Sequence, residues 1–373
     1  MSRGAEKTRV PLLMRDRSFY HTFLILAGTL ILEQAVVLSV NLADNLMIGS
    51  YNETALAAVA AVNQIVFVVQ QVIYGVTNGV IVLSSQYWGK QQTAPIRRLV
   101  CLGLRLEAAL SMLFFAVVSL WPAQCVGLFV TDAAIIAEGV RYLRVIRFTF
   151  PFFAVTTVLL GAMRSVETVS LALKVSVVSL VTNCVINYIL IFGRFGAPEL
   201  GVVGAAIATV LGQLVTAGMS VWYLCHTKVL KFEKADFRLS GRILGKFLPL
   251  GLCSFLAQIS LVIAMAATNS MLVKYGAQSE FGADIPLTVL GIVMKVFQII
   301  IAITIGMSAG CIPIVGYNYG AKQFGRCRGV LWRLMAAEFV LGAVSLVITQ
   351  CFPLQLISIF GSEDALYERF AVL

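Results

Sequence analysis

One segment of this sequence occurs twice, 231 residues apart and without a gap. The first copy, Gly75 to Gly89, reads GVTNGVIVLSSQYWG, and the second, Gly306 to Gly320, reads GMSAGCIPIVGYNYG. The same register pairs Trp121-Pro122 with Phe352-Pro353 further along the chain. Glycines, prolines and aromatic residues recur together, which chance matching of apolar residues would not produce. The chain therefore consists of two related halves, and the second half stops early.

The composition excludes a water-soluble fold. Hydrophobic residues make up 59% of the 373 residues and charged residues 12%, against roughly 25% charged in an average soluble domain. Apolar blocks recur along the chain, each with the ~20 residues that a spanning helix needs. They are too long for the ~10-residue strands of a membrane barrel. The sequence therefore predicts an all-α polytopic membrane protein in a lipid bilayer.

The net charge of +10 follows the predicted topology. Basic residues precede the first apolar block and lie in alternate connections, Arg164 and Lys174 among them, whereas Asp132 and Glu363 mark the acidic connections. This alternation is the positive-inside pattern, with a cytoplasmic N-terminus. We expect a multi-pass protein of the inner (plasma) membrane and no nucleic-acid partner.

No motif for cofactor or covalent chemistry is present. The eight cysteines have no CxxC pairing and are typical of small packing residues in apolar helices. The sequence contains no GxxxxGK[ST] loop for ATP and no HExxH motif. We therefore expect a protein that is not an enzyme and has no cofactor.

The apolar pattern predicts nine spans and the start of a tenth near Asp364. The spans are expected at 18–47, 54–83, 95–121, 134–161, 169–193, 200–226, 243–273, 285–315 and 327–352. Residues 1–226 would form an N-lobe of six spans, 227–242 a cytoplasmic linker and 243–373 a partial C-lobe. Six spans per half make the repeat parallel, with the substrate path between the halves. Gly75/Gly79 and Gly306/Gly310 match the small-xxx-small pattern of closely packed helices.

Several segments resemble the multidrug and toxic compound extrusion (MATE) family, in particular its bacterial multidrug-export branch, over residues 18 to 373. The segments are Val40–Gly49 with Ala55–Val59, Gln86–Lys90, Gly161–Ser165, Asn183–Gly193, Leu200–Ala208 and Pro313–Lys322.

The resemblance implies two parallel six-helix bundles, nominally twelve spans, in a monomeric secondary exporter. Such a protein expels amphipathic organic cations in exchange for H⁺ or Na⁺ and confers antibiotic resistance. This chain departs from the pattern by ending inside the tenth helix, so we expect a fragment or an incomplete product. Two alternatives stay open: a lipid-linked saccharide flippase of the same superfamily, and a non-transporting membrane fragment.

Asp44 is the first candidate for ion coupling. Glu33, Val37, Asn41 and Asp44 fall on one face of the first predicted helix. Ionisable residues inside a span normally face protein or a water-filled cavity, and this stripe suits a cation or proton site. The resemblance places the family's N-lobe aspartate at Asp44 and gives Glu33 no counterpart. The alternative is that Asp44 caps a helix end at the membrane surface.

Asn183 and Asn187 form a second polar pair on the fifth predicted span. The resemblance implies that this face approaches the first helix, and that the position of Asn187 is often an aspartate. Asparagine cannot titrate, but its carbonyl oxygen can bind Na⁺ together with Asp44. The alternative is that both asparagines hold helices together.

Four polar residues are candidates in the second half: Gln258, Asn269, Lys295 and Gln298. Asn269 aligns with Asp44 if the following loop contains an insertion, so the counterpart of Asp44 is neutral. Lys295 lies in the eighth predicted span, with Gln298 one turn on. Lys295 either supplies a functional charge or extends to an aqueous vestibule.

Overall fold

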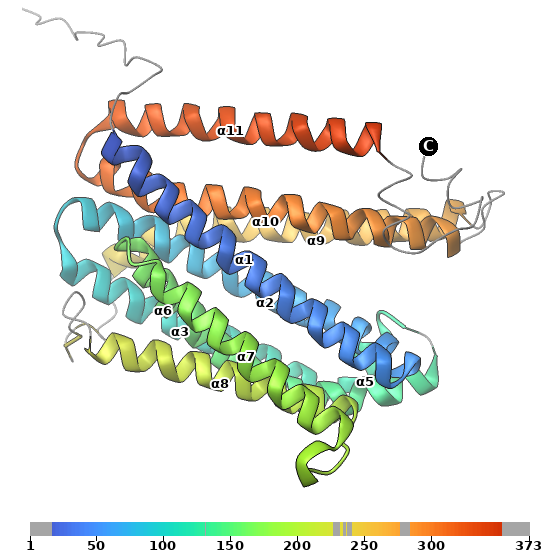
Figure 1. The fold of residues 1–373 in the computed structure, drawn as a ribbon. Coiled ribbons are helices and arrows are strands. Elements are labelled where there is room, and N and C mark those ends of the chain that lie inside the picture. The colour runs from blue at the N-terminus through green and yellow to red at the C-terminus, as the bar shows by residue number, and fades with distance from the viewer. Residues whose placement is uncertain are drawn as a thin grey trace, which may run out of the picture.

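The computed structural model describes residues 17–130, 132–226, 232–233, 236, 241–276 and 284–352, and all structural statements concern these residues. Apart from one 3₁₀ turn, Arg194–Gly196, their regular structure is α-helical (Figure 1). The helices are α1 (Arg17–Tyr51), α2 (Glu53–Gly89), α3 (Thr93–Leu120), α4 (Pro122–Gly127), α5 (Ala133–Ile146), α6 (Thr149–Ser165), α7 (Ser170–Phe192), α8 (Val202–His226), α9 (Gly241–Gly276), α10 (Asp284–Gly320) and α11 (Phe324–Cys351).

The polytopic all-α fold is confirmed. Eight of the described helices are long and apolar enough to cross a membrane, or nine if the bent pair α5 and α6 counts as one span. A helix satisfies the hydrogen bonds of its own backbone, and this is necessary in a bilayer because lipid tails cannot form hydrogen bonds with N–H and C=O groups. The predicted linker 227–242 lies mostly outside the described residues, and so does the predicted tenth span.

The fourth span differs from the prediction because it is broken. The sequence predicted one helix over 134–161, whereas α5 and α6 meet at 49°. Pro151 has no backbone N–H with which to reach the carbonyl of Arg147, four residues earlier. Instead Phe150 N donates to Arg147 O at 3.2 Å, which is a tighter turn. The bend therefore follows from a proline that the sequence already displayed.

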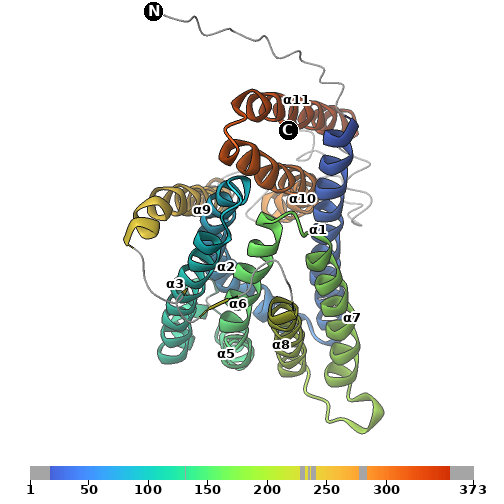
Figure 2. The ribbon, with the colours of Figure 1, turned by 90° about the vertical axis from the view of Figure 1, so that its left-hand side faces the viewer.

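The first eight helices form a closed ring, here called the N-terminal bundle. Seen end-on in Figure 2, α1 packs on α7, α7 on α8, α8 on the α5–α6 pair, α6 on α3, and α3 on α2. Helices α9 and α10 pack against α2, and α10 also packs against α1. Helix α11 lies along α10 on the outside (Figure 1).

The two copies of the repeat meet at the C-terminal ends of α2 and α10. A Cβ atom on Gly89 would lie 1.9 Å from the carbonyl oxygen of Tyr317, and one on Gly320 would lie 2.0 Å from that of Gln86. Gln86 and Tyr317, like Gly89 and Gly320, are equivalent positions of the two repeat copies, so the two contacts are equivalent to each other. A Cβ atom on Gly316 would likewise meet Ser85, its own equivalent position, at 2.4 Å. The two halves are thus related by a pseudo-twofold axis that passes between α2 and α10.

The turns that follow α2 and α10 also have the same geometry. Gln91 and Lys322, one repeat apart, have positive φ values of 57° and 62°. The backbone N–H of Gln92 donates to Tyr87, and that of Gln323 donates to Asn318, again one repeat apart. The repeat in the sequence is therefore also a repeat in backbone conformation.

The small-residue pairs pack closely, as predicted. A Cβ atom on Gly75 would come within 2.9 Å of the backbone of Phe255 in α9, and one on Gly306 within 3.0 Å of the backbone of Ile31 in α1. Gly79 and Gly310 approach the same two helices one turn further on. Their lack of a side chain lets α2 contact α9 and α10 contact α1 at backbone distance.

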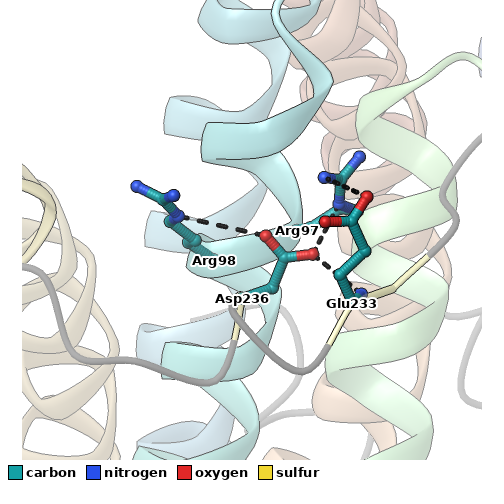
Figure 3. A network of polar contacts seen from close by, with 4 residues as sticks. All are labelled: Arg97, Arg98, Glu233 and Asp236. Atoms are coloured by element: carbon teal, nitrogen blue, oxygen red, sulfur yellow. Dashed lines mark hydrogen bonds and ion pairs between the residues drawn. The ribbon is translucent and has the colours of Figure 1, made fainter.

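Ion pairs attach a short stretch between α8 and α9 to the N-terminal bundle (Figure 3). Arg97 Nε donates to Asp236 Oδ2 at 2.6 Å, and Arg98 Nε lies 3.9 Å from Asp236 Oδ1. Arg97 also lies 3.6 Å from Glu233. Asp236 is 2% exposed, and Phe232 packs against the hydrophobic core. Two arginines of α3 therefore hold this part of the connection.

Candidate functional site

The N-terminal bundle encloses a cavity of about 250 Å³. Its walls come from α1, α2, α5, α6, α7 and α8. Apolar side chains such as Val66, Phe150 and Phe153 form much of the lining, and polar groups enter from several helices. An apolar cavity with a few converging polar groups is the usual form of a small-molecule site.

A chain of polar contacts leads from Asp44 to this cavity. Asn187 Nδ2 donates to Asp44 Oδ1 and also to Asn183 Oδ1, the latter at 3.1 Å. Asn183 Nδ2 in turn lies 3.4 Å from the hydroxyl of Thr209, which lines the cavity. Asn187 is 0% and Asn183 2% exposed, whereas Asp44 is half-buried. The structure therefore brings Asp44, Asn183 and Asn187 together, as the sequence suggested.

The helix register explains why these groups meet. Asn183 and Asn187 are four residues apart, so both project from one side of α7, and this side is buried. Asp44 lies inside α1, which continues to Tyr51. The side chain of Asn52 caps the next helix by accepting from Thr54 N. Asp44 therefore does not act as a helix cap.

The same cluster contains the oxygen atoms that a hard cation prefers. As oriented, the amide of Asn187 donates into the cluster, and its Oδ1 is buried without a hydrogen-bond partner in the described structure. The oxygen and nitrogen of an amide exchange places when the group turns over. That turn would direct Asn187 Oδ1 toward the oxygens of Asp44 and Asn183. The residues thus fit Na⁺ as well as a proton.

Glu33 and Asn41 lie on the cavity side of α1, as the predicted stripe implied. Both line the cavity together with Val37. Glu33 is 6% exposed and forms an ion pair with Arg164 of α6. Arg164, which the sequence placed in a basic connection, lies in the last turn of α6, one residue before its end, and Lys174 lies in the second turn of α7. The guanidinium of Arg164 reaches the cavity, where Glu33 supplies a buried partner for its charge.

Sequence reasoning missed one buried carboxylate. Glu107 of α3 is 0% exposed, and its carboxyl oxygens lie within hydrogen-bond distance of Thr77 Oγ1, at 2.6 Å, and of Thr157 Oγ1, at 3.0 Å. It is an ionisable residue inside an apolar span, which by itself indicates a functional group. The signal was therefore present in the sequence.

Two of the four candidates of the second half, Gln258 and Gln298, do not line this cavity. Gln258 is half-buried and Gln298 exposed. Asn269 and Lys295 lie in α9 and α10, but their side chains fall outside the described structure. The proposed roles of these four residues stay predictions.

Comparison with known proteins agrees with the fold. The MatE family profile matches residues 29–189 and 254–372. The probable multidrug resistance protein NorM of Rhizobium meliloti is 26% identical over 88% of this chain and 69% of its own length. The multidrug resistance protein MdtK of Yersinia pseudotuberculosis is 25% identical over 89% of this chain and 72% of its own length.

Solved structures share the arrangement of helices. A transporter of the MOP superfamily from Pyrococcus furiosus matches with a TM-score of 0.85 and 20% identity, over 100% of this chain and 80% of that one. A multidrug resistance MATE family transporter in an outward-facing conformation also matches with a TM-score of 0.85, over 94% of this chain and 76% of that one. At 20% identity these matches establish the fold only. The family profile covers most of the chain, and from it we conclude that the chain belongs to the MatE family.

Proposed function

We propose that the protein is a secondary active multidrug exporter that exchanges amphipathic organic cations for H⁺ or Na⁺. Two observations support exporting activity: membership of the MatE family, and relatives that are named multidrug resistance proteins. The observation that supports the coupling is the contact of Asp44 with Asn187, which also contacts Asn183 beside the cavity. We infer a monomer in the inner membrane with a cytoplasmic N-terminus.

Coupling by Asp44 would work through competition for one carboxylate. An ionised Asp44 attracts either a coupling cation or a cationic substrate in the neighbouring cavity. Binding of H⁺ or Na⁺ neutralises that charge, so the cationic substrate loses part of its attraction and leaves. A single carboxylate cannot stabilise both cations at once, and this makes the exchange obligatory.

The charges in and beside the cavity bear on its substrate. Glu33 and Arg164 line the cavity as an ion pair, and Asp44 lies beside it, linked to it through Asn187 and Asn183. Aromatic walls such as Phe150 and Phe153 suit the flat faces of organic cations. A flippase for lipid-linked saccharides would require a larger and more basic cavity. The aromatic walls and the negative charge of Asp44 support the proposal that the substrates are cations.

Alternating access would require the two halves to separate where they now meet. Helices α2 and α10 touch at backbone distance near Gly89 and Gly320, which closes this end of the molecule. Rocking of the halves about the pseudo-twofold axis would open it. We propose that this movement exposes the cavity to the two sides of the membrane in turn.

Transport by reconstituted protein tests the proposal. Protein expressed from the full reading frame would be placed in liposomes with ethidium, and H⁺ or Na⁺ gradients would be imposed separately. We expect Asp44→Asn to lower gradient-driven ethidium transport at least about tenfold, because Asn keeps the volume but removes the titratable charge. Asn187→Ala should have a smaller effect, since Asn187 carries no proton.

The matched control is Asp132→Asn. Asp132 caps α5 by accepting from the backbone N–H groups of Ala134 and Ile135, and asparagine caps equally well. The control should transport like the unmodified protein. Normal gradient-driven transport by Asp44→Asn would refute the coupling role, and no transport by the unmodified protein under either gradient would refute the exporter.

A further inference from the structure

We propose that Glu107 is a second proton-binding site, which exchanges its proton with the N-terminal cavity through the hydroxyls of Thr157 and Thr77. Its role in coupling rests on the proposed function, whereas the protonation of Glu107 in this conformation does not.

Burial without a basic partner is the first argument. The side chain of Glu107 is 0% exposed. The ion pairs formed among the described residues do not include it. A buried carboxylate that lacks a cation is strongly destabilised while ionised, and binding a proton removes the charge.

Counting hydrogens gives the second argument. The hydroxyl of Thr157 lies 3.0 Å from Glu107 Oε2, 2.9 Å from Phe153 O and 3.1 Å from Ala154 O. A hydroxyl has only one hydrogen to donate, and backbone carbonyls can only accept. If Thr157 donates to its helix carbonyl, Glu107 Oε2 must be the donor in its contact with Thr157. Thr77 then donates to Glu107 Oε1 at 2.6 Å. This arrangement satisfies each group and places one proton on Glu107.

The two hydroxyls also provide the route to the cavity. Thr77 and Thr157 line the cavity, whereas Glu107 lies behind them. A proton leaving Glu107 Oε2 passes to Thr157 Oγ1 while the original Thr157 hydrogen moves to a water molecule in the cavity. The net result is a carboxylate on α3 and one more proton in the cavity.

Glu107 and Asp44 have different hydrogen-bond partners, Thr77 and Thr157 for Glu107 and Asn187 for Asp44. The titratable groups that line the cavity near Thr77 and Thr157 are Tyr74 of α2, Glu33 of α1 and Arg164 of α6. Arg164 is already paired with Glu33, and on α3 itself Arg105 is exposed. Glu33 and Asp44 are separated by eleven residues of α1, or about 16 Å of helix rise. Asp44 therefore lies about three turns of α1 away from the Glu33–Arg164 pair.

Infrared difference spectroscopy of the purified 373-residue chain tests the protonation directly. A protonated carboxylic acid has a carbonyl stretching band that a carboxylate lacks. We expect the unmodified chain at neutral pH to show this band, Glu107→Gln to lose the intensity of one carboxylic acid, and Thr157→Val to move the band to higher frequency. The matched control, Glu138→Gln, alters a partly exposed glutamate that is paired with Arg141, and should leave the band unchanged. Identical spectra for Glu107→Gln and the unmodified chain would overturn the proposal.

Exchange with the cavity is tested on the same samples. Raising the pH, or adding ethidium, should diminish the Glu107 band, and Asp44→Asn should retain it. A band that persists through both treatments would identify a fixed structural proton and overturn the proposed exchange. If the band responds but the full-length protein transports no ethidium under any gradient, the proposed function fails while the proton site stands.

Discussion

Replacing Gly89 by alanine should shift the protein away from the closed conformation in which α2 and α10 touch. Gly89 lies at the end of α2, where its backbone touches α10. The added Cβ atom would lie 1.9 Å from Tyr317 O and 2.7 Å from Tyr317 C. Backbone atoms cannot yield as the end of a flexible side chain can, so the two helices themselves must move apart.

The structure gives the size of the effect. A carbon atom normally stays about 3.3 Å or more from a carbonyl oxygen, so the helix ends must separate by roughly 1.4 Å. Forcing a methyl group into a close contact costs about 1–3 kcal/mol. The higher helix propensity of alanine acts equally in any conformation that keeps α2 helical, and it cancels. The ratio of closed to open molecules should therefore fall by about 5- to 150-fold.

Distances between spin labels would report the shift. Gln92 and Gln323 are exposed, are related by the repeat and make no side-chain capping hydrogen bond, so cysteines can replace them without loss of a contact. Labels there, in a background without the native cysteines, would be compared by double electron–electron resonance with and without Gly89→Ala. We expect a new population at longer distance.

Gly218→Ala is the matched control for this experiment. A Cβ atom on Gly218 would have nothing within 4 Å, so the distance distribution should stay unchanged. If Gly89→Ala also leaves the distribution unchanged, then α2 and α10 do not meet as described, and the argument from close approach is wrong.

Three further predictions concern the connections and the packing. Arg97→Ala should destabilise the protein in detergent by about 3 kcal/mol, because it leaves the buried carboxylate of Asp236 without its main partner; Glu233→Ala, at an exposed pair, should cost less than about 1 kcal/mol in the same thermal unfolding assay. Cysteines at Lys234 and Asp132 should react with impermeant reagents from opposite sides of the membrane, and labelling of both from one side would contradict the predicted topology. Limited proteolysis should leave the N-terminal bundle intact longest, since α11 packs mainly on α10 and has one buried residue; faster loss of the bundle than of α11 would contradict this.

Sequence alone determined the membrane fold, the repeat and most helix positions. Apolar blocks long enough to span a bilayer have one local solution, because the backbone must satisfy its hydrogen bonds within the segment. The glycines of α2 and α10 indicated the close packing through their spacing alone, since few other reasons place small residues four apart on a helix. The family resemblance pointed to Asp44 and Asn187, and the structure places them in contact.

The tertiary structure decided which polar groups share a site. Glu33 and Arg164 are 131 residues apart, and their pairing depends on where the fold places α1 and α6 around the cavity. Glu107 became interpretable only when Thr77 and Thr157, from two other helices, were seen to surround it. Helical periodicity fixes the face on which a side chain lies, because that is a local property of one backbone. The partner it meets depends on how helices distant in sequence pack, and no local pattern encodes that.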